Sequence, residues 1–111
     1  MESKILNTVK AWIPQCYSGQ EEQSEYHVLK QVASYCLLHF EGDEAEQQLA
    51  KEALQVIGLL YYNGSLHTKN AIENEFLEHL AASESPASLR KHLASFPKEL
   101  APVYIKTILE N

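Results

Sequence analysis

The sequence has little of what several functional classes need. Its longest basic run is the pair Arg90-Lys91, so it offers no basic stripe to nucleic acid or to an anionic membrane. The four glycines stand apart from one another, so no glycine-rich loop is available to cradle a phosphate. Its apolar runs fall well short of the ~20 residues that a membrane-spanning helix needs. We therefore expect neither a nucleic-acid partner nor a membrane partner.

Cysteine is scarce as well. The chain has two cysteines, Cys16 and Cys36, which are too far apart to form a Cys-X-X-Cys pair. The first residues also lack the continuous apolar core of a signal peptide, because Lys4, Asn7 and Lys10 interrupt it. These two absences favour the cytoplasm, where thiols stay reduced.

What is present is the composition of an ordinary folded domain. The length of 111 residues fits one domain, and 45% of the residues are hydrophobic while 22% are charged. The net charge of −6 is uneven, because residues 1–64 hold four lysines and nine acidic residues. Residues 65–111 hold five basic and six acidic residues. An acidic half of this kind suits a basic protein partner, although acidic faces also keep proteins soluble.

The apolar residues recur at helical spacing, and no segment alternates apolar and polar residues as a strand does. This pattern predicts an all-α protein, a single compact bundle of five or six helices. The single domain covers residues 1–111, with an N-terminal helix at 2–13, a linker at 14–23 and the main bundle at 24–111. The linker is polar over residues 18–23. We expect the bundle helices near residues 25–40, 44–62, 70–80, 86–96 and 98–110.

Residue types at the expected helix ends support these bounds. Ser24 and Asp43 are typical N-caps, and Ser85-Pro86 combines a cap with a proline in the first turn. Helical wheels place the core on Leu29, Leu37, Ile57, Phe76 and Leu80, and they add Trp12, Tyr26 and Leu49 to the apolar faces.

The segment NAIENEFLEHL, residues 70–80, carries an unusual density of acidic and amide groups. On a wheel, Glu73 falls inside the apolar arc, and a buried carboxylate there would indicate function. The simpler interpretation is a capping box, in which Asn70 caps the helix and the Glu73 side chain returns to the backbone of Asn70. We expect the capping role.

The same segment offers one possible metal site. Glu75 and His79 lie one helical turn apart, and His92, with His39 or Asp43, would complete a ligand set if the fold brought them together. An i,i+4 Glu–His pair also occurs on helix surfaces without any ligand. A small metal- or ligand-binding protein that uses Glu75, His79 and His92 is therefore the alternative function.

Two longer stretches carry a family resemblance. LLYYNGSLHTKNAIENEFLEHLA (Leu59–Ala81) and SLRKHLASFPKELAPVYIKTILEN (Ser88–Asn111) resemble a family of small uncharacterised bacterial proteins, a domain of unknown function. The resemblance is clearest in NAIENEFLE and in the turn FPKEL. It implies a compact all-helical cytosolic protein and supplies no catalytic residues. Some such proteins are similar in size and acidity to immunity proteins that neutralise toxins.

The sequence favours a protein–protein interaction module, such as an acidic immunity-like or regulatory partner of a basic protein. The acidic residues Glu41, Glu44 and Glu46 are the candidate partner-binding residues, because they gather where one helix ends and the next begins. No group of residues supports catalysis, so we expect no enzymatic activity, no cofactor and no bound metal. The oligomeric state stays open.

Overall fold

Helices are the only regular elements in the two ranges that the computed structural model describes, residues 3–17 and 24–110. They are α1 (Lys4–Trp12), the 3-10 turn η1 (Pro14–Cys16), α2 (Glu25–Phe40), α3 (Glu44–Asn63), α4 (Leu66–Ala71), the π-helical turn η2 (Ile72–Leu77), α5 (Glu78–Ala81), α6 (Pro86–Leu93) and α7 (Ala101–Glu110). Because α4, η2 and α5 follow without a break, the described residues form six helical rods. The predicted all-α bundle is confirmed, and the expected polar segment at 18–23 lies outside the described residues.

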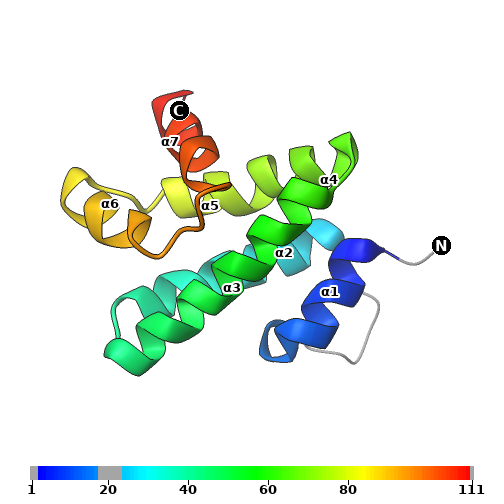
Figure 1. Cartoon of the computed structure of the whole chain (residues 1–111), viewed down its shortest axis with the longest axis horizontal. Helices are drawn as coiled ribbons and strands as arrows, with labels where there is room; N and C mark the ends of the chain where they lie inside the picture. The colour runs from blue at the N-terminus through cyan, green and yellow to red at the C-terminus, as the bar shows by residue number, and fades with distance from the viewer. Residues whose placement is uncertain (1–2, 18–23, 111) are drawn as a thin grey trace.

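Helix α2 is the centre of the bundle. It packs against α3, against η2 and α5, and against α1. Figure 1 shows α1 on one side of the α2–α3 pair and α6 with α7 on the other side. The radius of gyration of 13.1 Å matches the ~13 Å expected for a compact domain of this length.

Serine and aspartate side chains set the starts of most helices. Ser24, Asp43 and Ser85 each accept a hydrogen bond from the backbone N–H three residues later, as predicted. The expected cap at Asn70 is wrong. Ser65 directly follows the end of α3 and accepts from the Thr68 N–H at 3.3 Å, so the helix begins at Leu66 and Asn70 lies inside it.

The π-helical turn also changes the position of Glu73. In a π-helix the backbone bonds run from i to i+5, so each turn is wider and a wheel drawn for an α-helix misplaces its residues. Glu73 is only partly buried, and its Oε2 accepts a hydrogen bond from the Tyr61 hydroxyl at 2.7 Å. Burial, together with this bond to a carboxylate, raises the pKa of Tyr61 to about 12. Glu73 therefore joins η2 to α3 and does not cap a helix.

The expected core is largely confirmed. Leu29, Ile57, Phe76 and Leu80 are buried, whereas Leu37 is only partly buried at the edge of the core. Two further predictions are wrong: Tyr26 is 48% exposed and Leu49 is 40% exposed. A helical wheel places a side chain on one face of its helix but cannot show how far the neighbouring elements cover it.

The turn between α6 and α7 packs tightly against α3. A Cβ atom on Gly58 would lie 2.8 Å from Cγ of Pro97, so only glycine lets the proline ring approach this closely. Within the same turn, Phe96 stacks on Tyr104 of α7 with ring centroids 4.5 Å apart. Helix α6 ends at Leu93 and α7 begins at Ala101, so both are shorter than predicted. Pro102 sits in the first turn of α7, where a missing N–H costs nothing.

Candidate functional site

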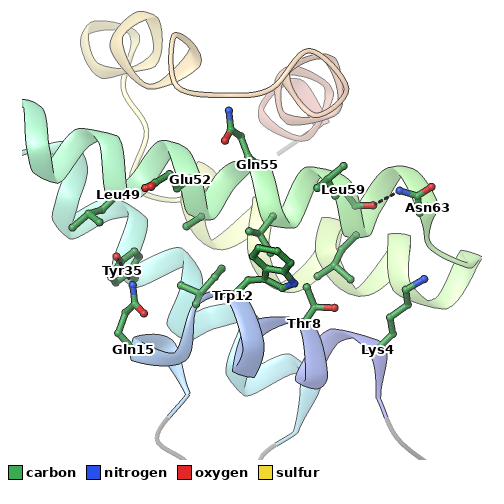
Figure 2. A pocket seen from close by; sticks show the side chains of 14 residues that line it. Lys4, Thr8, Trp12, Gln15, Tyr35, Leu49, Glu52, Gln55, Leu59 and Asn63 are labelled. Carbon is green, nitrogen blue, oxygen red and sulfur yellow. Dashed lines mark hydrogen bonds between the residues drawn. The ribbon is translucent and has the colours of Figure 1, made fainter.

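An open groove of about 620 Å³ runs between α1 and α3. Its α1 wall consists of Lys4, Thr8 and Trp12, which are spaced four residues apart and so share one face of the helix. Figure 2 shows Trp12 midway along the groove.

The α3 wall has a regular pattern. Leu49, Glu52, Val56, Leu59 and Asn63 line it in steps of three and four residues. This is the spacing by which one helix presents a seam to another helix. The floor beneath is apolar and buried, and it is formed by Ile13, Ala53 and Leu60.

Large apolar side chains of the groove are open to water. Trp12 is 73% exposed, Leu59 is 65% exposed and Leu49 is 40% exposed. The apolar stripe predicted for the N-terminal helix includes Trp12, but only Ile5, Val9 and Ile13 are buried there. Neighbouring exposed apolar side chains on a soluble domain commonly mark a binding surface.

An acidic corner lies at one end of the groove, where α2 ends and α3 begins. We use this name for Glu41, Asp43, Glu44 and Glu46, which are all exposed. Glu46 is three residues before Leu49, so the corner borders the first residue of the α3 wall. Of the predicted partner-binding residues, Glu44 and Glu46 lie in the first turn of α3, whereas Glu41 follows the end of α2 with its Oε1 3.8 Å from Nε2 of His92.

A buried polar centre lies on the other side of α3, around Glu84 in the turn before α6. The Glu84 side chain is 4% exposed. Its Oε1 accepts from the Tyr104 hydroxyl at 2.8 Å and lies 2.7 Å from Nδ1 of His92, and its Oε2 accepts from the Ser88 hydroxyl. Because a carboxylate only accepts, Nδ1 of His92 carries the proton.

The charge of this centre follows from its hydrogen bonds. Burial alone would raise the pKa of Glu84, but the bonds from Ser88, His92 and Tyr104 outweigh it and hold the pKa below its usual value. Glu84 is thus ionised at neutral pH. Burial and the bond to Glu84 in turn raise the pKa of Tyr104. The three donors satisfy the carboxylate inside the protein, while Nε2 of His92 is buried without a hydrogen-bond partner and lies 3.8 Å from Oε1 of Glu41.

The sequence patterns do not predict this centre. Glu84 has the sequence context of a surface loop residue, His92 has that of a helix edge, and Tyr104 has that of an aromatic at the core edge. Glu84, Ser88 and His92 are spaced four residues apart, which is the sequence signal that could have indicated a contact among them. The Ser85-Pro86 cap, however, predicts that Glu84 lies outside the helix. His92 is 4% exposed and stacks on Phe40 at 4.2 Å between ring centroids.

The residues of the predicted metal site have separate partners. Glu75 pairs with Lys30 at 3.4 Å, and His79 lies 3.2 Å from the Ser34 hydroxyl. His92 instead faces Glu84, and its Nε2 lies 3.8 Å from Oε1 of Glu41. Within residues 3–17 and 24–110, no three His, Cys, Asp or Glu side chains are grouped so that they could hold a metal ion. The fold therefore does not assemble Glu75, His79 and His92 into a site.

The sequence matches one family model over residues 6–110, that of a "Domain of unknown function (DUF7674)". The chain belongs to this family. The expected membership in a family of unknown function is thereby confirmed, and the match reaches from α1 to α7. Apart from Lys4, the residues of both groove walls lie within the matched range, and so does the polar centre. Neither the comparison with curated proteins nor the comparison with solved structures gives a match.

Two remaining properties of this family member bear on function. Among the described residues, no helix combines the length and the apolar character that crossing a bilayer requires. Both thiols are free and buried. Burial raises the pKa of Cys16 to about 11, and it raises the pKa of Cys36 as well. Neither thiol has the thiolate character of a nucleophile at neutral pH.

Proposed function

We propose that the protein is a protein–protein interaction module that binds a basic partner protein in the groove between α1 and α3. The observation that carries the proposal is the exposure of Trp12 and Leu59 along a groove whose floor is apolar. Tryptophan is among the residues that contribute most to binding energy at protein interfaces. Covering these side chains would remove apolar surface from water.

The shape of the groove supports a protein partner over a small ligand. Its volume is within the range of small-molecule sites, but such sites enclose most of the ligand surface. Here the central aromatic side chain is 73% exposed, so the groove is a shallow trough. The acidic corner beside it supports a basic partner, because charge complementarity speeds the encounter of two proteins.

We propose no catalytic role. The buried carboxylate of Glu84 accepts hydrogen bonds from Ser88, His92 and Tyr104 inside the fold. A charged group in this state supports the packing of α6 and α7. An acidic regulatory or neutralising role toward a basic protein is the specific form of the interaction that we propose.

Quantitative capture from cells that make the protein tests the groove. Wild-type protein, Leu59→Gln and Leu109→Gln are immobilised in parallel, and bound proteins are quantified. Leu109 is 80% exposed on α7, so it is a matched control outside the groove. A partner should be retained about tenfold less by Leu59→Gln and equally by Leu109→Gln. Equal retention by all three proteins would rule out the groove.

Association kinetics with that partner test the acidic corner. Glu41, Glu44 and Glu46 are changed to Lys while Asp43 is left to cap α3. The control changes Glu78, Glu99 and Glu110 to Lys, which alters the net charge equally at exposed positions outside the corner. At low salt the corner variant should associate roughly tenfold or more slowly, and the difference should shrink as salt rises. An unchanged association rate would remove the acidic corner from the interface.

A further inference from the structure

The groove has the dimensions and the spacing of a helix-binding surface. From Leu49 to Asn63 the α3 wall rises fourteen residues, which is about 21 Å or roughly four helical turns. The wall residues recur in steps of three and four, so a helix placed alongside can insert its own apolar side chains between them. The trough is bordered by helices throughout, and none of the described residues forms a strand edge that could pair with an extended peptide.

The charges along the groove are polarised. The acidic corner lies at the Leu49 end, and Figure 2 shows Lys4 of the α1 wall and Asn63 of the α3 wall at the opposite end. Between the two ends, Glu52 is the charged residue that lines the groove. A ligand helix in the groove therefore meets negative charge at one end and positive charge at the other.

The backbone of a helix has its own polarity, with about half a positive charge at the N-terminus and half a negative charge at the C-terminus. The acidic corner carries four carboxylates against the half charge of the α3 N-terminus, so the corner is negative overall. This end of the groove favours the N-terminus of a bound helix, and Lys4 favours its C-terminus. Lysine or arginine in the first turn of the ligand would add to the preference.

We propose that the groove binds an amphipathic α-helix of the partner parallel to α3, with a basic first turn at the acidic corner and its apolar stripe against Trp12 and Leu59. This inference rests on the proposed function, and it adds the secondary structure, the direction and the charge pattern of the bound segment. A helix of about sixteen residues spans the groove.

A display library tests the inference with defined peptides. Its members are peptides of about sixteen residues without tryptophan, with apolar residues fixed in steps of three and four and with Lys, Glu, Gln or Ser elsewhere. Peptides that bind the wild-type protein but not Leu59→Gln are sequenced. The inference predicts that the selected peptides have lysine in the first turn and glutamate in the last turn. An isolated helix prefers the opposite arrangement, because of its own dipole.

Synthetic versions of the selected peptides supply the second measurement. Trp12 is the only tryptophan in the chain, so its emission reports the groove directly. Binding should shift this emission to shorter wavelength, and the variant Glu44→Gln/Glu46→Gln should bind about tenfold more weakly than wild type at low salt. The variant Glu78→Gln/Glu99→Gln, with two exposed acids outside the corner, should bind like wild type.

Each of the other possible outcomes would rule out one part of the inference. Groove-dependent peptides without charge asymmetry, or with lysine in the last turn, would overturn the direction and leave the groove as a binding site. A failure to select any groove-dependent peptide would overturn the helical ligand. If capture from cells still gave a partner that depends on Leu59, the proposed function would stand while this inference failed.

Discussion

The groove and the polar centre depart from ordinary protein construction in opposite ways. At the groove, apolar side chains such as Trp12 and Leu59 lie in water. At the polar centre, the carboxylate of Glu84 is almost completely buried. Both arrangements cost free energy by themselves, because exposed apolar surface and buried charge are each unfavourable.

The difference lies in what compensates each cost. Hydrogen bonds within the chain compensate the charge of Glu84. They come from Tyr104 on α7 and from Ser88 and His92 on α6. The exposed groove has no such compensation in the described residues, since Trp12 stays 73% exposed beside the apolar floor. An internally satisfied anomaly serves the fold, whereas an unsatisfied one indicates a partner. Mutations should separate the two regions accordingly.

The largest expected effect is at the polar centre. Glu84→Ala removes the acceptor of the buried donors of Tyr104 and His92, while the Ser88 hydroxyl can still donate to the Ser85 carbonyl. We expect it to lower the free energy of unfolding by about 3 kcal/mol, measured by urea denaturation. A loss below about 0.5 kcal/mol, as for an ordinary surface residue, would show that the centre does not hold α6 and α7 in place.

The pH dependence of the free energy of unfolding should show whether Glu84 in the polar centre is ionised. Because the pKa of Glu84 is lower in the folded protein than its usual value of 4.5, the unfolded chain binds more protons between the two values. The stabilisation by Glu84 is therefore complete above about pH 4.5 and is lost as the pH falls through the lower folded value.

Glu25 needs a separate control, because hydrogen bonds from His67 and Ser3 also lower its pKa. Urea denaturation of Glu84→Gln and Glu25→Gln between about pH 3 and pH 6 separates the two contributions. Each variant should lose part of the acid-induced decrease that wild type shows. Identical slopes for wild type and Glu84→Gln would contradict an ionised, hydrogen-bonded Glu84.

A smaller effect distinguishes the two possible helix starts. Ser65→Ala removes the cap of α4 and should cost about 1 kcal/mol. Asn70→Ala changes an exposed position within the helix and should cost less than about 0.5 kcal/mol. Thermal or urea unfolding of both variants measures the difference. A larger loss of stability for Asn70→Ala than for Ser65→Ala would instead support the capping box at Asn70 and Glu73.

The smallest effect on stability is expected in the groove. Leu59→Gln and Trp12→Gln change side chains that are mostly exposed, so the free energy of unfolding should stay within about 0.5 kcal/mol of wild type. The same variants should nonetheless show the largest loss of binding. A stability loss near that of Glu84→Ala would mean that the groove side chains serve the fold, and the contrast between the regions would fail.

The sequence predicts the elements whose signals are local. Ser24, Asp43 and Ser85 begin helices where expected, because capping involves residues only three positions apart. The start of α4 is mispredicted because Ser65 and Asn70 are both good caps. The end of α3 and the wider π-helical turn decide between them, and neither has a clear signature in the sequence.

The two sites are harder to predict than the fold. A helical wheel assigns Trp12 and Leu49 to an apolar face, but it cannot distinguish a face buried in the core from one that lines a groove. The polar centre joins Glu84 to Tyr104 twenty residues away, a contact that only the tertiary fold creates. By contrast, Glu41, Glu44 and Glu46 cluster already in the sequence, so their placement at one exposed corner follows from the turn between two helices.

The environment of Trp12 in the complex tests the central claim most directly. Incorporation of 5-fluorotryptophan into this protein alone gives a single fluorine resonance, since Trp12 is the only tryptophan, whatever the partner contains. On titration with a captured partner, we predict that this resonance shifts and becomes protected from contact with water. A partner that binds while the resonance keeps its position and its solvent exposure would contradict the claim that the groove is the binding site.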